Sequence, residues 1–111
     1  MEISIAAQGP RVAVAHLKGR VDLASAPGVR ARLTEVVAAG QDHLVVDLAE
    51  VPFIDSSGLG ALISVLKTAR QAGGDLRIAS TDDQPLTVLK LTSLDRVLKP
   101  YTTVEEALTG L

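Results

Sequence analysis

The segment Asp55–Gly60, which reads Asp-Ser-Ser-Gly-Leu-Gly, carries the residues of this chain best suited to chemistry. It follows an aliphatic run, Leu44–Leu48, that predicts a buried strand, and it opens a periodic apolar stretch that predicts a helix over Ser57–Ala72. The first amides of a helix have no internal hydrogen-bond partners, and the helix dipole makes that end positive. Asp and Ser side chains satisfy such amides, so a helix cap alone accounts for the pattern, although a phosphate would also bind well there.

Two features of this segment exceed what a cap requires. Three capping candidates, Asp55–Ser57, stand in a row where one would suffice. Gly58 and Gly60 fall in the first helical turn, where each costs about 1 kcal/mol relative to alanine. That cost predicts the close approach of something else, such as another molecule's backbone or a phosphate. Leu59 would then be less shielded and could contact a partner, although its position also fits the apolar stripe of the helix.

The sequence does not support a catalytic reading of the serines. A serine nucleophile needs a base within hydrogen-bond reach, and the only histidines, His16 and His43, fit ordinary positions in or beside predicted strands. There is no G-x-S-x-G elbow, Walker loop or G-x-G-x-x-G motif. The chain lacks cysteine, which excludes disulfides and thiolate metal sites, and no spacing makes its carboxylates converge on a metal. We therefore expect neither an enzyme nor a bound cofactor.

Composition narrows the class of partner. The chain has 111 residues, 47% hydrophobic and 22% charged, which predicts one globular domain over residues 1–111. A net charge of −2 and only two aromatic residues argue against nucleic acid as a partner. No apolar run approaches the roughly 18 residues of a membrane span, and the first residues do not resemble a signal peptide. We expect a cytoplasmic protein that does not bind membranes.

The remaining pattern alternates strands and helices. An α/β fold is predicted, with a single mixed β-sheet of four to five strands and about four α-helices. The first two strands should form an antiparallel hairpin with the second strand interior, and the strand–helix–strand unit 44–79 should be a parallel, right-handed crossover. The expected elements, in order, are a strand around Ile3–Ile5, a strand at Arg11–Lys18, a helix capped by Ser25 and ended by Gly40, the strand Leu44–Leu48, the helix Ser57–Ala72, the strand Leu76–Ala79, a helix from Pro85 to Leu91, a weak edge strand at Val97–Leu98, and a last helix from Thr102 or Thr103.

These residues carry a resemblance to a known family. The string Ile54–Gly60, preceded by Val-Val-Asp-Leu at Val45–Leu48, resembles the signature of STAS domains, and in particular of the bacterial anti-sigma-factor antagonists. Gly19–Asp22 resembles the family's Gly-x-x-Asp turn, and Ala72–Gly74 fits the family pattern before the next strand. The order of elements is similar over essentially the whole chain.

The resemblance implies a phosphorylation switch. In that family the unmodified antagonist binds an anti-sigma factor that is itself a serine kinase, and a sigma factor is thereby freed. The kinase phosphorylates the serine directly after the aspartate, here Ser56, and a metal-dependent serine phosphatase reverses the change. Ser57 would stay unmodified and cap the helix, and Asp22 would lie in a neighbouring loop at the same surface. The implied partner surface comprises Asp22, Asp55, Ser56, Ser57, Gly58, Leu59 and Gly60.

Two other functions remain open on the sequence. The chain could be a non-switching STAS subunit of a transporter or another multiprotein complex, in which the serine is not modified. It could also be a small nucleotide-binding domain or enzyme that uses the helix start as a phosphate site. The switch makes one structural demand that the other functions do not: the Ser56 hydroxyl must be exposed on a firm base so that a kinase can reach it.

Overall fold

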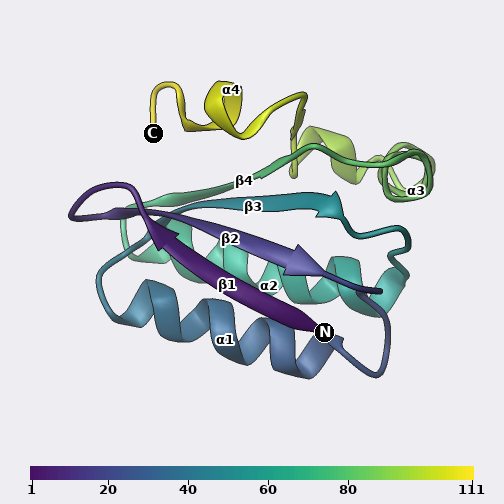
Figure 1. The fold of residues 1–111 in the computed structure, drawn as a ribbon, viewed down its shortest axis with the longest axis horizontal. Helices are drawn as coiled ribbons and strands as arrows, with labels where there is room; N and C mark the ends of the chain where they lie inside the picture. The colour runs from purple at the N-terminus through teal and green to yellow at the C-terminus, as the bar shows by residue number, and fades with distance from the viewer.

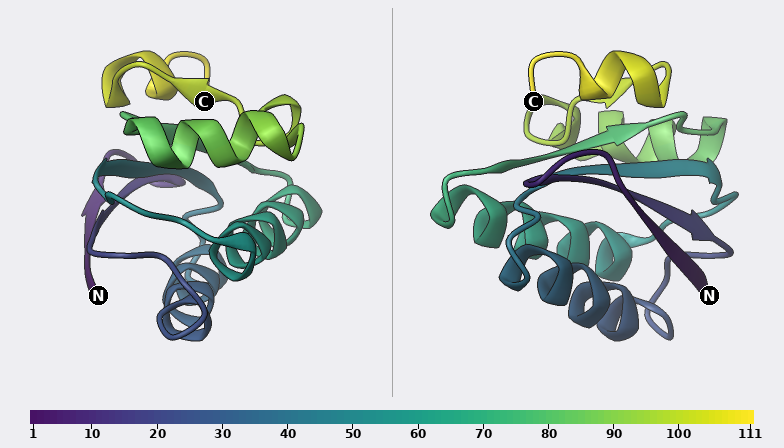
Figure 2. Two further views of the ribbon diagram at one scale, coloured as in Figure 1. Left: turned by 90° about the vertical axis from the view of Figure 1, so that its right-hand side faces the viewer. Right: turned by 60° about the vertical axis from the view of Figure 1, so that its left-hand side comes forward.

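The computed structural model describes residues 1–111 and arranges them around one five-stranded sheet, with helices α1 and α2 on one face and α4 on the other (Figures 1 and 2). Helix α3 lies near the end of the sheet at which α2 begins (Figure 1). The elements are β1 (Glu2–Ala7), β2 (Val12–Lys18), α1 (Ala26–Ala38), β3 (His43–Glu50), α2 (Ser56–Gln71), β4 (Asp75–Ala79), α3 (Asp83–Leu91), a 3-10 turn (Leu94–Arg96), β5 (Pro100–Tyr101) and α4 (Val104–Leu108).

The strands follow one another across the sheet in chain order, β1 to β5. β1 and β2 form the predicted antiparallel hairpin, and β2 is interior. β3 pairs in parallel with β2 on one side and with β4 on the other. The predicted fold class, a mixed α/β sheet with four helices, is confirmed. None of the helices is long and apolar enough to cross a lipid bilayer.

The main core fills the space between the sheet and the helices α1 and α2. The predicted stripe of α1 is buried through residues such as Val29 and Leu33, and α2 contributes Leu59, Leu62 and Leu66. Fully burying one such side chain stabilises the fold by about 1.5–3 kcal/mol. The amino-terminal half of α2 is therefore fixed against the sheet by its core-facing side, while its opposite side remains at the surface.

The edge strand does not form where the sequence predicted it. Val97 and Leu98 follow the 3-10 turn, and Leu98 is fully buried in the main core. The strand that pairs with the edge of β4 is Pro100–Tyr101. Proline has no amide hydrogen to donate, which restricts it to edge positions of a sheet, so Pro100 is compatible with this one. The prediction at Val97–Leu98 was wrong because the Leu98 side chain packs into the main core, and the segment that carries it does not pair with the sheet.

Ser25 occupies the position before α1 but does not cap it. Its hydroxyl donates to the carbonyl of Arg20 at 2.7 Å and accepts from the amide of Asp22 at 3.0 Å, so no side-chain capping bond to α1 forms. The hydroxyl closes the Arg20–Ser25 turn instead. At the other end of the chain, Thr103 caps α4 as its spacing predicted, accepting from the amide of Glu106.

Candidate functional site

Helix α2 begins at Ser56, and Asp55 is its cap. The backbone of Asp55 is extended, and its carboxylate oxygen Oδ1 accepts a hydrogen bond from the amide of Gly58 at 2.9 Å. The backbone carbonyl of Asp55 accepts from the amide of Leu59. The expectation that Ser57 caps this helix was wrong, because Ser57 already lies inside the helix and Asp55 has the extended backbone that a capping residue needs.

The second carboxylate oxygen of Asp55 ties a neighbouring loop to the helix start. Oδ2 accepts from the amide of Leu23 at 3.0 Å. Between the backbones, the amide of Asp55 donates to the carbonyl of Val21 at 3.2 Å, and the amide of Val21 donates to the carbonyl of Phe53 at 3.0 Å. The turn 19–22, which the sequence could not place, therefore lies directly beside the start of α2, and Asp22 lies in that loop.

A side chain from α3 is hydrogen-bonded to the other edge of the segment Phe53–Asp55, the edge that faces away from Val21. The amide of Ile54 donates to Oε1 of Gln84 at 2.8 Å, and Nε2 of Gln84 donates to the carbonyl of Ile54 at 3.0 Å. The segment Phe53–Asp55 is thus bonded on both edges, by the backbone of Val21 on one side and by Gln84 on the other. No local sequence pattern indicates this role for Gln84, because Gln84 and Ile54 are 30 positions apart.

The charged groups of the turn are engaged locally. The Asp22 carboxylate accepts from the amides of Ala24 and Ser25, and it lies 3.6 Å from Nε of Arg20. Hydrogen bonding from Ser25 is the main cause of a lowered Asp22 pKa, with smaller contributions from Ala24 and Arg20. The guanidinium of Arg20 stacks 4.0 Å above the ring of Phe53. These contacts brace the loop that faces the helix start.

The two serines differ in their surroundings. Ser56 is exposed, and its hydroxyl forms no hydrogen bond with the rest of the protein. Ser57 is partly exposed and faces a pocket between α1 and α2. The Ser57 hydroxyl likewise forms no hydrogen bond within the protein, so the two differ in exposure: Ser56 is the fully exposed one, at the first residue of a helix whose preceding segment is bonded on both edges.

The two glycines also differ. A Cβ on Gly58 would lie 2.2 Å from the carbonyl oxygen of Val21, so glycine is required there by the chain's own backbone. The expectation that a foreign group approaches at this position was wrong for Gly58. At Gly60, by contrast, an added Cβ would meet nothing within 4 Å, and the residue is exposed. Leu59 is only 2% exposed and belongs to the core.

No second set of reactive groups accompanies the serines. His16 pairs with Asp47 and His43 pairs with Asp42, each at 2.7 Å, so neither histidine contacts a serine. There is no group of three or more metal-ligating side chains. The geometry shows an exposed hydroxyl with no internal base beside it.

Comparison with known proteins assigns the class. A sequence model of the STAS domain matches residues 5–107, so the chain belongs to the STAS family, whose anti-sigma antagonist members are regulatory binding proteins and not enzymes. RsfB, the anti-sigma-F factor antagonist of Mycobacterium tuberculosis, is 32% identical over 102 residues, 90% of this chain and 81% of RsfB. A relative from Thermotoga maritima is 35% identical over 74 residues, 67% of this chain and 66% of that protein.

A solved structure supports the same assignment. An anti-sigma factor antagonist from Mycobacterium paratuberculosis matches with a TM-score of 0.82 and 28% sequence identity, over 97% of this chain and 92% of that one. The resemblance read from the residues Ile54–Gly60 is confirmed by these comparisons.

Proposed function

We propose that this chain is an anti-sigma factor antagonist whose binding is switched at Ser56. The unphosphorylated form binds an anti-sigma factor that is also a serine kinase, and so frees a sigma factor in the cytoplasm. The kinase phosphorylates Ser56, which abolishes binding, and a serine phosphatase restores the original state. Family membership and the names of the relatives support the general role. The exposed, unbonded hydroxyl of Ser56 is the observation that carries the switch.

The start of α2 can accept a phosphate without being rebuilt. The amides of Ser56 and Ser57 donate to no acceptor within the chain, and the helix dipole favours negative charge at this end. Phosphorylation adds about −1.5 to −2 charges at neutral pH. The Asp55 carboxylate remains occupied by the amides of Gly58 and Leu23. We therefore expect the phosphorylated protein to keep its fold.

The partner, in contrast, meets a different surface. An interface fitted to a neutral hydroxyl would have to bury a doubly charged group next to Asp55. A desolvated charge without a counterion costs several kcal/mol, and each 1.4 kcal/mol lowers affinity about tenfold. This loss needs no change in the fold. Several residues of the proposed partner surface are wholly or partly exposed, among them Asp22, Ser56, Ser57 and Gly60. Gly58 and Leu59 are buried and support this surface from below.

The test is phosphorylation by the anti-sigma kinase of the source organism with ATP, followed by mass spectrometric mapping. Phosphate is expected on Ser56. Ser56→Ala should bind the kinase and resist modification, while Ser56→Asp should bind weakly. Ser4→Ala, at an exposed serine of β1 outside the proposed partner surface, is the matched control and should be modified and released like the parent. Phosphate on another residue, or equal binding by Ser56→Ala and Ser56→Asp, would contradict the proposal.

The alternative is a non-switching STAS subunit of a transporter or another complex. It uses the same fold and gives Ser56 no modification. Stable association of the chain with a membrane complex, together with no phosphorylation by a soluble kinase, would favour this alternative over the switch.

A further inference from the structure

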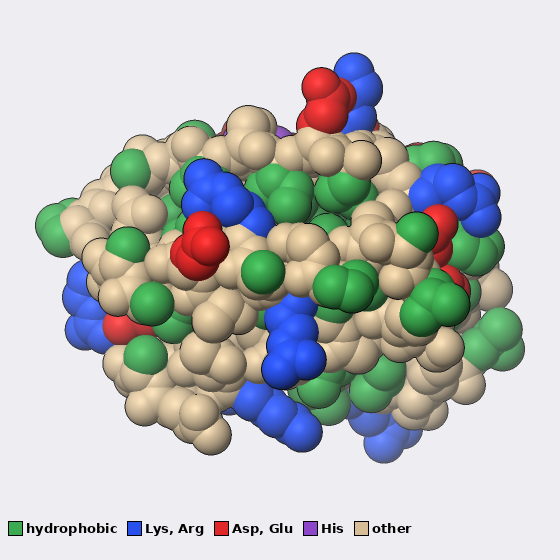
Figure 3. All heavy atoms as spheres, turned by 90° about the horizontal axis from the view of Figure 1, so that it is seen from below, with side chains coloured by type: hydrophobic (Ala, Val, Ile, Leu, Met, Phe, Trp, Pro, Cys, Tyr) green, Lys and Arg blue, Asp and Glu red, His purple; other side chains and the backbone are tan.

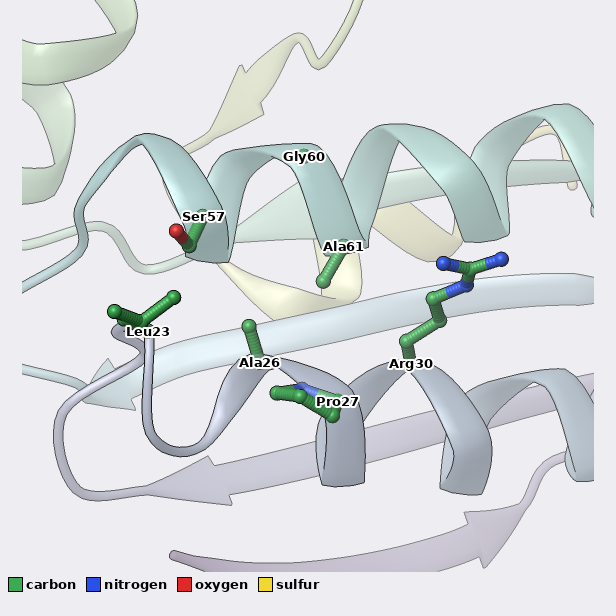
Figure 4. A pocket seen from close by; sticks show the side chains of 7 residues that line it. All are labelled: Leu23, Ala26, Pro27, Arg30, Ser57, Gly60 and Ala61. Atoms are coloured by element: carbon green, nitrogen blue, oxygen red, sulfur yellow. The ribbon is translucent and has the colours of Figure 1, made fainter.

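A pocket lies between the amino-terminal halves of α1 and α2, immediately beside the start of α2 (Figure 4). Its volume is about 280 Å³. We call it the α1–α2 pocket. It is lined by Leu23, Ala26, Pro27, Arg30, Ser57, Gly60 and Ala61. One of the two serines of the site therefore forms part of its wall, and the other precedes it by one residue in the chain.

Gly60 keeps this pocket open. Nothing lies within 4 Å of the place where its Cβ would be, so neither packing nor backbone conformation requires glycine. The contrast with Gly58 is direct, because Gly58 is in contact with the backbone of Val21. Glycine in a helix is unfavourable. Its effect at position 60 is to leave space at the surface that an incoming group can occupy.

The rim of the pocket is apolar and fixed in place. Leu23 is 74% exposed, which is unusual for a large aliphatic side chain, and Pro27 is exposed as well. The backbone amide of Leu23 is bonded to the Asp55 carboxylate, so this side chain projects from an anchored position. An exposed apolar rim around an open space is a feature of interaction sites.

Arg30 supplies the only charge in the pocket. Its side chain extends from α1 towards α2 (Figure 4) and takes part in no ion pair within the protein. The surrounding helices are also basic. α2 contains no acidic residue, and the two helices together carry four basic side chains and one acidic one, although the whole chain has a net charge of −2. Figure 3 looks onto this face, where Lys and Arg side chains are prominent.

We propose that the α1–α2 pocket receives a segment of the anti-sigma partner that presents an aliphatic side chain and a nearby carboxylate. The aliphatic group fills the space above Gly60 between Leu23 and Pro27, and the carboxylate pairs with Arg30. This inference rests on the proposed function. It also explains how one phosphate releases the partner, because the added negative charge at Ser56 repels the carboxylate that the pocket attracts.

The test measures binding of the purified anti-sigma kinase to four variants by calorimetry, with thermal unfolding of each variant alongside. Gly60→Leu fills the pocket, and Gln71→Leu places the same side chain at the far end of α2 as its control. Arg30→Glu reverses the charge, and Arg32→Glu is its control on the same helix. The first member of each pair should weaken binding by about tenfold or more, as for a central contact, and each control should match the parent.

Two further readouts separate recognition from folding. Gly60→Leu should unfold at a temperature no lower than the parent, since no atom lies in its way. Added salt should weaken binding of the parent more than that of Arg30→Glu. If the parent binds and is phosphorylated at Ser56 while Gly60→Leu and Arg30→Glu bind like the parent, the pocket inference is overturned and the proposed function stands. If the parent neither binds nor is phosphorylated, both are overturned.

Discussion

Alanine at Gly58 and alanine at Gly60 should change stability in opposite directions, although the two residues are one helical half-turn apart. At Gly58 the new Cβ would lie 2.2 Å from the Val21 carbonyl oxygen, 2.8 Å from Val21 Cγ1 and 2.9 Å from Ile54 Cγ1. Relief requires a backbone shift of about 1 Å to reach ordinary contact, and overpacking of this kind costs about 1–3 kcal/mol. The same carbonyl accepts the amide of Asp55, so that hydrogen bond, worth about 1 kcal/mol, is also lost.

The gain in helix propensity offsets about 1 kcal/mol of this cost. The net expectation for Gly58→Ala is a loss of about 1–3 kcal/mol in the free energy of unfolding. For Gly60→Ala only the propensity gain remains, so the protein should become more stable by up to about 1 kcal/mol. Urea unfolding followed by circular dichroism measures the stability of both variants. An unchanged slope of the free energy of unfolding against urea concentration indicates that the same surface is exposed on unfolding. Equal stability of Gly58→Ala and the parent would refute the close approach of α2 to Val21.

Two further predictions concern the side chains around the site and the dependence of stability on pH. Gln84→Leu should speed hydrogen exchange at the amide of Ile54 and lower the free energy of unfolding by about 1–3 kcal/mol, because both backbone groups of Ile54 lose their partner. Gln84→Glu keeps the acceptor but loses the donor, so it should still protect the amide; fast exchange in both variants would contradict this geometry. The folded-state pKa of Asp42 is lowered chiefly by its hydrogen bond from Arg11, and that of Asp22 by Ser25. The stabilisation is present above the ordinary Asp pKa and is lost as the pH falls through the lowered one, so the free energy of unfolding should drop below about pH 4. Urea unfolding at a series of pH values from 7 to 3 measures this decrease in the free energy of unfolding. The decrease should be smaller in Asp42→Asn, and an equal decrease in that variant would assign the pH dependence to other groups.

The sequence predicted the fold well where local periodicity and burial agree. The α1 stripe, the aliphatic run of β3 and the α2 stripe each have one dominant period, and each forms the predicted element. The prediction failed at Val97–Leu98, where a pair of residues is too short to show a period and burial of Leu98 decides the path of the chain.

The start of α2 lies where the sequence predicted it, but the contacts that hold it in place were not predictable. Asp55, Ser56 and Ser57 are all acceptable caps by residue type, and only the backbone conformation selects Asp55. The bonds from Gln84 to Ile54, and the approach of Gly58 to Val21, join residues 30 or more positions apart. No local pattern encodes such contacts. The open space at Gly60 was visible in the sequence only as a helix residue with an unexplained cost.

The bonding of Phe53–Asp55 along both edges has a consequence for the speed of the proposed response. A switch that works through loop reordering must wait for the chain to rearrange after each chemical event. Here the segment before Ser56 is hydrogen-bonded along both edges and needs no rearrangement, so under the proposed function the partner meets the new charge as soon as the ester forms. Under the proposed function, the catalytic turnover of the kinase and the phosphatase would then set the tempo of the signal, and the antagonist itself would add no lag.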